Sequence, residues 1–241
     1  IIIGVPSNVS EVEKKALLDV CRASGARDAY LVEEPIAAAI GAGLPIGDAV
    51  GNMIVDIGGG TTEIAVISLN GIVVGRSLKV GGNVMDADIA SYFRVRWGLS
   101  IGEKTAEEIK IVLASAYPMR VEREMMVRGR DLEKGLPKAI KVTSVNIREA
   151  LAPTINTIVS AVRDTLHDAP PELANDISEK GIVLCGGGSQ IFGIAKLISV
   201  EVKMPVVVAA EPLTCVARGC TQLLSNDTLL NKVKVAPGSV Q

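Results

Sequence analysis

The stretch Gly51-Asn52-Met53-Ile54-Val55-Asp56-Ile57-Gly58-Gly59-Gly60-Thr61-Thr62-Glu63 joins an apolar run to three successive glycines. The apolar run at 53–57 predicts a buried strand, the glycines predict a tight turn, and residues 63–67 predict the returning strand. Asn70-Gly71 is a strong hairpin signal, and a third strand is expected at 72–74. This part of the chain therefore predicts a three-strand meander.

The glycine turn has the chemistry of a phosphate-binding loop. Three glycines at a strand end let the backbone approach a ligand and point several N–H groups into one concavity. Thr61 and Thr62 add hydroxyl donors, and Asp56 is placed to hold Mg²⁺ through water. The plainer alternative is a tight turn that needs glycine, for which one or two glycines would be enough. No Gly-Lys-Ser/Thr follows, and a strand rather than a helix comes next, which excludes the Walker A and dinucleotide-binding loops.

Upstream of this meander, the order is strand, helix, strand, helix. Residues 1–5 form a buried-strand pattern, and Ser10-x-x-Glu13 is a capping box that starts a helix. A second strand at 29–32 leads through Glu33-Glu34-Pro35 into a helix at 36–40. This order predicts a parallel sheet with right-handed crossovers. The opening strand has no polar lead-in, so we expect the earlier strands of its domain to be absent.

Downstream of the meander, helices are expected at 85–97 and 105–116, and hairpins of a small peripheral subdomain in the charged segment 117–141. A long apolar stripe predicts a helix over 144–167 that begins or kinks at Pro153. A strand at 181–185 precedes a second glycine loop, and a strand at 206–208 precedes a last helix at 214–224. The tail from 231 is expected to be frayed.

The second glycine loop, Gly186-Gly187-Gly188-Ser189, is read as running from a strand into a helix. Its bare glycines and the helix N-terminus would receive a base or a ribose, although a simple strand-to-helix turn explains the same pattern. Glu33-Glu34-Pro35 also has two interpretations. The acids serve the dipole of the helix that follows, or one of them orients a water molecule that attacks a γ-phosphate.

Composition supports an α/β architecture. The 241 residues are 48% hydrophobic and only 2% aromatic, and small and β-branched side chains suit parallel strands that helices cover. The net charge of -2 gives no overall attraction to nucleic acid. The four cysteines form no CxxC pair and His167 is the single histidine, so buried thiols are expected rather than a zinc site. The apolar stretches are too short to span a bilayer.

Several segments resemble the MreB family of bacterial actin-like proteins, within the actin, sugar-kinase and heat-shock-chaperone ATPase superfamily. They are residues 51–63 together with Leu31-Val32-Glu33-Glu34-Pro35-Ile36-Ala37-Ala38-Ala39-Ile40-Gly41-Ala42-Gly43, Ile101-Gly102-Glu103-Lys104-Thr105-Ala106-Glu107-Glu108-Ile109-Lys110, Pro170-Pro171-Glu172-Leu173-Ala174 and Pro212-Leu213-Thr214-Cys215-Val216-Ala217. The similarity extends from residue 1 to about 224.

This resemblance implies an α/β, actin-like (ribonuclease H-like) two-domain ATPase fold, with mixed sheets flanked by helices and the first domain incomplete. Residues 1–50 would be the remainder of the first domain. Residues 51–98 and 143–225 would form the second domain, with its last helix returning toward the first. Residues 99–142 would be a small peripheral subdomain and 226–241 a tail.

The resemblance also implies an ATP and Mg²⁺ site. Glu34 would be the catalytic, water-orienting carboxylate, and Asp56 would face Mg²⁺ through water. The remaining cofactor-binding positions would be the phosphate loop Gly58, Gly59, Gly60, Thr61 and Thr62, the ribose-side acid Asp86, the adenosine-flanking Glu107 and Lys110, and Gly186, Gly187 and Gly188 beneath the base. The two glycine loops are expected on separate sheets, converging on one nucleotide from opposite sides.

Two departures from the family pattern limit this expectation. No Asp-x-Gly-Thr strand is present to supply the first phosphate loop, and nothing matches the smallest subdomain or the hydrophobic membrane loop. As given, the chain is expected to bind nucleotide weakly and to hydrolyse it poorly, whereas the full-length protein would be a weak ATPase. Gly82-Asn83 replaces a usually acidic position and leaves the paralogue open.

The resemblance implies an ATP-dependent filament on the inner face of the cell membrane, which guides cell-wall synthesis and rod shape. Its partners would be further copies of itself, the membrane surface and wall-synthesis proteins, with no nucleic acid, in a cytoplasmic, peripheral location. One alternative is a specialised filament of the magnetosome or plasmid type. Another is a soluble chaperone-like or kinase-like ATPase, but a substrate domain beyond 224 and a sugar-binding insert are both missing from the sequence.

Overall fold

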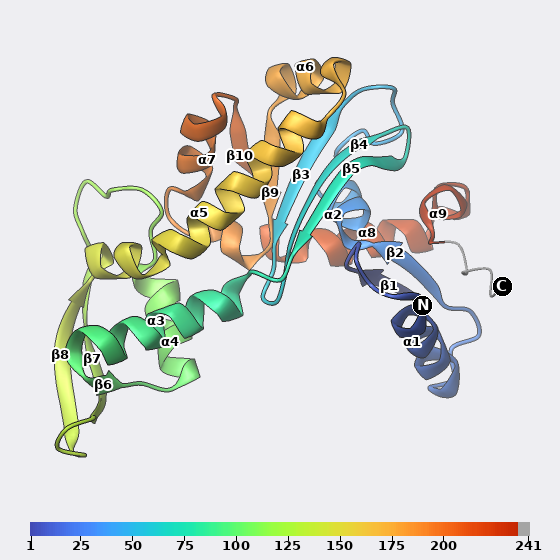
Figure 1. Ribbon diagram of the computed structural model, residues 1–241. Coiled ribbons are helices and arrows are strands. Elements are labelled where there is room, and N and C mark those ends of the chain that lie inside the picture. Colours follow the sequence, from blue (N-terminus) through green and yellow to red (C-terminus); the bar gives the residue numbers. More distant parts are fainter. Residues whose placement is uncertain (236–241) are drawn as a thin grey trace.

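A computed structural model describes residues 1–235 (Figure 1). In this range the strands are β1 (Ile2–Val5), β2 (Tyr30–Glu33), β3 (Asn52–Ile57), β4 (Thr62–Ser68), β5 (Gly71–Leu78), β6 (Leu99–Ser100), β7 (Glu124–Asp131), β8 (Pro137–Thr143), β9 (Ile182–Cys185) and β10 (Val206–Val208). The α-helices are α1 (Glu11–Ala23), α2 (Glu34–Gly41), α3 (Gly82–Trp97), α4 (Glu103–Leu113), α5 (Ser144–Asp168), α6 (Pro171–Lys180), α7 (Ile194–Val202), α8 (Cys215–Leu224) and α9 (Asp227–Val233). Two 3-10 turns are η1 (Gly187–Gln190) and η2 (Pro212–Thr214).

The largest sheet has five strands in the order β10-β9-β3-β4-β5. Strands β10, β9 and β3 run parallel, whereas β3, β4 and β5 are joined in antiparallel pairs. The predicted meander is therefore confirmed, and it extends a parallel α/β sheet by two antiparallel strands. Every residue of β3 and β4 is buried because helices cover both faces of the sheet.

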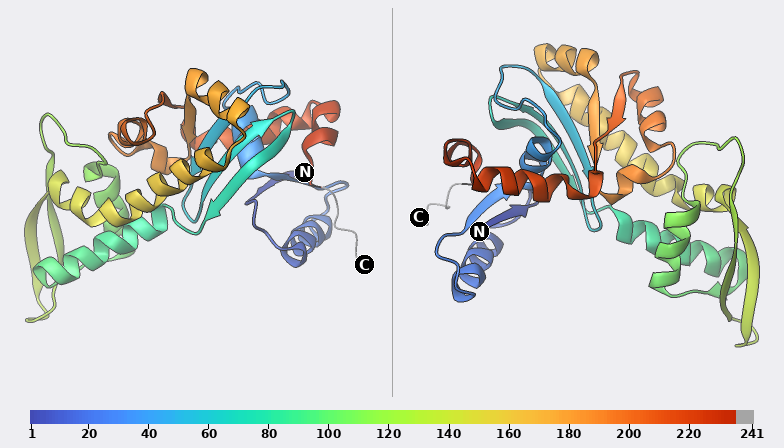
Figure 2. Two further views of the ribbon diagram at one scale, coloured as in Figure 1. Left: turned by 45° about the horizontal axis from the view of Figure 1, so that its top comes forward. Right: turned by 180° about the vertical axis from the view of Figure 1, so that it is seen from behind.

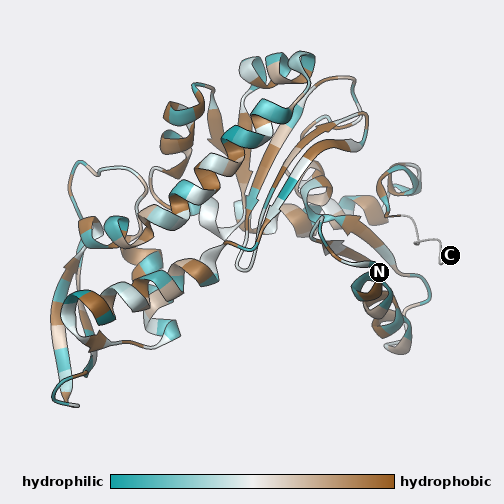
Figure 3. Ribbon diagram, viewed as in Figure 1, coloured by the Kyte–Doolittle hydropathy of each residue, from teal (hydrophilic) through white to brown (hydrophobic). Residues whose placement is uncertain are grey.

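The two faces of the sheet belong to two hydrophobic clusters. Met53, Val55 and Ile57 of β3 pack in the larger cluster with residues of α3, α5 and α7. Ile54, the alternate residue, packs in the smaller cluster with α2 and α8. Because successive strand residues point to opposite faces, an unbroken apolar run is what a strand covered on both sides requires. In Figure 3 the ribbons of these central strands are largely brown, the colour of hydrophobic residues.

Strands β1 and β2 form a separate, parallel two-stranded sheet, with Val5 opposite Glu33. The predicted capping box of α1 is confirmed, since the Ser10 N–H donates to Glu13 Oε2 at 2.9 Å and the Ser10 side chain accepts from the Glu13 N–H. Strands β6, β7 and β8 form a third sheet around one long antiparallel hairpin. Figure 2 shows this hairpin and α1 at opposite ends of the molecule.

The predicted long helix is confirmed as α5, which is continuous from Ser144 and therefore has Pro153 in its interior rather than at its start. Its N-terminus is closed by a capping box in which Asn146 accepts from the N–H of the N-cap residue Thr143. The expectation that the tail frays from 231 is corrected: α9 (Asp227–Val233) continues to residue 233, because Val233 is buried against the smaller cluster. Residues 236–241 lie outside the described range. No helix within residues 1–235 is long and apolar enough to serve as a membrane span.

Candidate nucleotide site

The two glycine loops lie side by side at one edge of the five-stranded sheet. Asp56 at the end of β3 is in register with Cys185 at the end of β9, and each strand continues into its glycine loop. A Cβ built on Gly188 would lie 2.2 Å from Ile57 Cγ2. The expectation that the loops occupy separate sheets is therefore wrong: neighbouring parallel strands place their carboxyl ends, and the loops that follow, at the same edge.

The first loop is held against the start of α3. The Gly58 N–H donates to the Thr61 carbonyl at 2.9 Å, which closes the turn. The carbonyl groups of Gly58 and Gly59 accept from the N–H groups of Gly82 and Asn83 at 2.9 and 2.8 Å. These bonds occupy the carbonyl groups on the α3 side of the loop and fix its position.

Neither backbone conformation nor packing within the chain requires glycine at position 60, at the tip of the first loop. It is exposed, it does not have a positive φ, and a Cβ built on it would meet no atom within 4 Å. Neither a strained turn nor close packing within the chain explains the residue, so the tight-turn alternative is not supported at this position. A loop that must let a ligand approach the backbone does explain it.

Thr62 does not offer its hydroxyl to a ligand. The side chain is fully buried, and its Oγ1 donates to the Val80 carbonyl at 2.7 Å. The expectation that both threonine hydroxyls are phosphate donors is therefore wrong for Thr62, because strand β4 begins at this residue and turns its side chain inward. Thr61 is half-buried and remains accessible at the loop.

The second loop is explained largely by packing inside the chain. Gly186 has φ +77°, and a Cβ on it would lie 2.4 Å from both Asp56 Oδ1 and the Ile57 carbonyl oxygen. Gly188 is buried. The loop enters the 3-10 turn η1, and α7 starts only at Ile194, so the expected helix N-terminus is not at the loop. The simple-turn alternative thus accounts for Gly186 and Gly188, and Gly187 alone is exposed.

The predicted acids Glu34 and Asp56 lie close enough to affect one another. Glu34 is half-buried at the start of α2, and desolvation, followed by the charges of Asp56 and Glu63, raises the pKa of Glu34 to about 7. Burial also raises the pKa of Asp56, opposed by a hydrogen bond from the Cys185 thiol. Removing a carboxylate from water disfavours its charged form, which is why burial is the largest cause of both shifts.

Glu63 is a member of this acidic group that sequence reasoning left without a role. It lies directly opposite Asp56 in the β3–β4 pair and is 1% exposed. Its Oε1 accepts from Ser77 Oγ at 2.5 Å and its Oε2 accepts from the Ser7 N–H at 3.3 Å. The signal available in the sequence was a carboxylate directly before the apolar run at 64–67 of a strand expected to be buried. Burying a carboxylate costs free energy unless it has hydrogen-bond partners.

Asp86, Glu107 and Lys110 come together where α3 faces α4. Lys110 Nζ donates to Asp86 Oδ2 at 2.7 Å and to the Gly82 carbonyl at 2.9 Å. Desolvation raises the pKa of Asp86 despite this bond. A hollow of about 760 Å³ is lined by both acids, among other residues, and it reaches Asn83, which bonds the first glycine loop.

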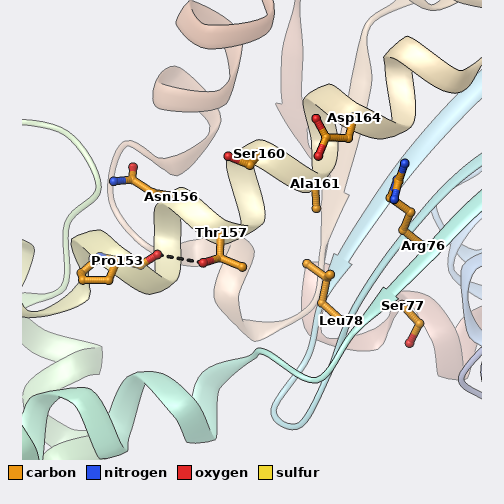
Figure 4. A pocket seen from close by; sticks show the side chains of 9 residues that line it. All are labelled: Arg76, Ser77, Leu78, Pro153, Asn156, Thr157, Ser160, Ala161 and Asp164. Atoms are coloured by element: carbon orange, nitrogen blue, oxygen red, sulfur yellow. Dashed lines mark hydrogen bonds between the residues drawn. The ribbon is translucent and has the colours of Figure 1, made fainter.

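A second hollow, of about 580 Å³, is separate from this site. Figure 4 shows it between α5 and the edge strand β5, with Arg76 and Asp164 at one end and Pro153 and Thr157 at the other. Arg76 is paired with Ile64, which faces the larger cluster, whereas Asp56 and Glu63 point to the other face of the sheet. This hollow is therefore not part of the acidic site.

Comparison with known proteins gives a consistent result. The MreB/Mbl protein family profile matches residues 1–232. The cell shape-determining protein MreB of Escherichia coli K12 is 51% identical over 219 residues, which are 91% of this chain and 63% of that protein. The cell shape-determining protein Mbl of Bacillus subtilis 168 is 44% identical over 235 residues, 98% of this chain and 71% of the relative. The chain thus spans less than two thirds of the E. coli protein.

Solved structures support the same fold. MreB5 of Spiroplasma citri bound to ADP superposes with a TM-score of 0.91 at 40% identity, over 96% of this chain and 70% of that one. The MamK double helical filament superposes with a TM-score of 0.79 at 24% identity, over 93% of this chain and 68% of that one, and it shows the shared fold alone. The predicted actin-like α/β class is confirmed, and the chain belongs to the MreB/Mbl family.

Proposed function

We propose that this chain forms the nucleotide-binding part of an ATP-dependent, actin-like filament protein that guides cell-wall synthesis and rod shape. The main support is the meeting of Glu34 and Asp56 beside the exposed Gly60 loop, where open space lies in front of the loop backbone. The related MreB5 of Spiroplasma citri, 40–41% identical, has been solved with ADP and with AMPPNP.

In this proposal, the loop from Gly58 to Thr61 receives phosphate oxygens, with Gly60 allowing the closest approach. Asp56 holds Mg²⁺ through water, and Glu34 orients the water that attacks the γ-phosphate. The fit is electrostatic: desolvation raises the pKa values of both Glu34 and Asp56, and the charges of Asp56 and Glu63 raise that of Glu34 further. When bound, Mg²⁺ would neutralise charge on both the phosphates and the carboxylates.

The nucleoside would occupy the hollow between α3 and α4. Its volume of about 760 Å³ falls in the range that small-molecule sites use, ~300–1,000 Å³. Asp86 would lie on the ribose side, with Glu107 and Lys110 flanking the adenosine. Gly187 is the one member of the second loop left to approach the base, whereas Gly186 and Gly188 serve its packing against β3.

Assembly and location complete the proposal. Further copies of the protein are its first partner, and the inner face of the cell membrane and wall-synthesis proteins are the others. The support is membership of a family whose relatives are named cell shape-determining proteins. Because the chain spans 63% of the E. coli relative, hydrolysis and assembly are assigned to the full-length protein.

The test uses the full-length protein with Mg²⁺ and ATP. We expect saturable binding of a fluorescent ATP analogue, sedimentation of filaments in ATP, and slow release of phosphate. Glu34→Ala should still bind ATP but release phosphate at least 10-fold more slowly, since positioning of the water is lost. Unchanged hydrolysis would remove Glu34 from its role. ATP hydrolysis without any sedimentation would instead favour the soluble chaperone-like ATPase.

A further inference from the structure

Glu63 links two parts of the molecule that are otherwise joined by helices. Its carboxylate lies on β4 of the five-stranded sheet, and it accepts the Ser7 N–H from the loop that follows β1. Among residues 1–235, no other hydrogen bond joins residues 1–34 to the five-stranded sheet. The other connection between the two sheets is apolar packing through α2 and α8.

The carboxylate is itself held in a fixed orientation. Ser77 Oγ, on the neighbouring strand β5 and directly opposite Glu63, donates to Oε1 at 2.5 Å. Oε2 is then left to accept the Ser7 N–H at 3.3 Å. A 1%-exposed carboxylate with one oxygen anchored on its own sheet has little rotational freedom, so the Ser7 loop has one position in which its N–H is satisfied.

Glu34 is tied to the same body as Ser7. Strands β1 and β2 are paired in parallel with Val5 opposite Glu33, the residue before Glu34. A Cβ built on Gly4 would lie 3.3 Å from Glu34 Cγ, so β1 packs directly against the Glu34 side chain. A shift of the Ser7 loop relative to β4 would therefore move the strand that packs against the Glu34 side chain, and so change how that side chain is directed toward the glycine loop that begins five residues before Glu63.

We propose that Glu63 is a positioning residue, which, by holding the Ser7 N–H, sets the distance between Glu34 and the loop from Gly58 to Thr61. This inference rests on the proposed ATP hydrolysis, because it assigns Glu63 an effect on the step that Glu34 serves. Glu63 acts through hydrogen-bond geometry and does not touch the phosphates. The charge of Glu63 also raises the pKa of Glu34, but the positioning role does not depend on that effect.

Two opposite substitutions separate geometry from charge. Glu63→Gln removes the charge but keeps the length, so its amide oxygen accepts the Ser7 N–H and its NH₂ group donates to Ser77 Oγ. Glu63→Asp keeps the charge but is one methylene shorter and reaches only one of its two partners. We expect Glu63→Gln to keep kcat within about threefold, and Glu63→Asp to lower kcat about 10-fold or more with KM changed less than about threefold.

Glu122 offers a control away from the five-stranded sheet, although it is more exposed than Glu63 and also pairs with Arg148. It also accepts a serine hydroxyl, from Ser144, and a loop N–H, from Met119 at 3.2 Å. Glu122→Asp should lower thermal stability and leave kcat unchanged. This variant shows what shortening a glutamate by one methylene does at a position that does not connect β1 to the five-stranded sheet.

Amide hydrogen exchange at Ser7 gives a readout that needs no nucleotide. The Ser7 amide should exchange about 10-fold faster in Glu63→Asp than in the wild type, and at the wild-type rate in Glu63→Gln. The proposal is overturned if Glu63→Gln is the slow variant, or if Ser7 exchange rises in Glu63→Asp with kcat unchanged. A wild-type protein that hydrolyses no ATP overturns the proposed function together with this role. A wild type that hydrolyses ATP and a Glu63→Asp variant of equal kcat overturn this role alone.

Discussion

Gly219 of α8 rests directly on the backbone of Ala37 in α2, so closely that a Cβ on Gly219 would lie 1.9 Å from the Ala37 carbonyl oxygen. The contact is reciprocal, since a Cβ on Gly41 of α2 would lie 1.8 Å from the Cys215 carbonyl oxygen. Two helices can approach to this extent only where both present glycine. This crossing supports the smaller cluster, which packs the helices against the five-stranded sheet.

We therefore expect Gly219→Ala to destabilise the protein by about 3 kcal/mol or more, since the new methyl group meets backbone that cannot move aside. Urea unfolding would measure the loss as a lower midpoint at unchanged slope. Gly71→Ala is the matched control, because a Cβ there makes only an ordinary contact of 3.8 Å with the Ser68 carbonyl oxygen. Equal stability of the two variants would contradict the close crossing.

The glycine loops should respond differently to the same substitution. Gly60→Ala places its methyl group in open space, so folding stability should change by less than about 1 kcal/mol while nucleotide binding weakens about 10-fold or more. Gly186→Ala adds a Cβ at a position with a left-handed backbone, where that atom would clash with Asp56 and Ile57. It should lower the free energy of unfolding by at least about 2 kcal/mol. Thermal unfolding and titration with a fluorescent ATP analogue measure the two effects. Tight binding by a folded Gly60→Ala protein would argue against the phosphate role.

Glu34 should make stability depend on pH. Burial raises the pKa of Glu34 from 4.5 to about 7 in the folded protein, so the folded state holds the proton more tightly than the unfolded state. The stability that Glu34 gains from holding this proton is present in full below pH 4.5 and is lost as the pH rises through 7. Glu34→Gln should therefore gain stability over the wild type between pH 5 and pH 8, on the order of 1–2 kcal/mol after solvent screening.

Chemical unfolding of both proteins at pH 5, 6, 7 and 8 would measure this difference. Glu122→Gln serves as a control of opposite sign, because bonds from Ser144 and Arg148 hold the pKa of Glu122 below its usual value. That variant should lose stability relative to the wild type as the pH rises from acid values. A Glu34→Gln difference that is constant with pH would mean that Glu34 keeps an ordinary pKa.

Lys110 should be necessary to keep Asp86 in its half-buried position. Lys110→Met retains the apolar stem but leaves Asp86 with neither oxygen paired, because Oδ1 already lacks a partner. We expect a loss of about 1–3 kcal/mol, and a smaller loss when Asp86→Asn accompanies it. A double-mutant cycle from denaturant unfolding measures the coupling. Additive losses would show that the pair contributes nothing by itself.

Local patterns predicted much of the fold. The apolar run at 53–57, the capping box at Ser10 and the hairpin near Asn70 were recognisable because periodicity and turn chemistry act over a few residues. Even there, local detail differed: the left-handed residues of the hairpin turn are Leu69 and Asn70, and Gly71 already begins β5. The start of the tail was misjudged because the burial of Val233 depends on helices that are distant in sequence.

The sequence by itself determined the element order, the α/β class and the two glycine loops, since these depend on residues that are neighbours along the chain. The tertiary structure alone decided that the loops share one sheet, that Thr62 turns inward, and that Ser7 meets Glu63 across 56 positions. Strand order and the choice of buried face are settled by which arrangement covers the most apolar surface and satisfies the buried polar groups, and that balance belongs to the whole molecule.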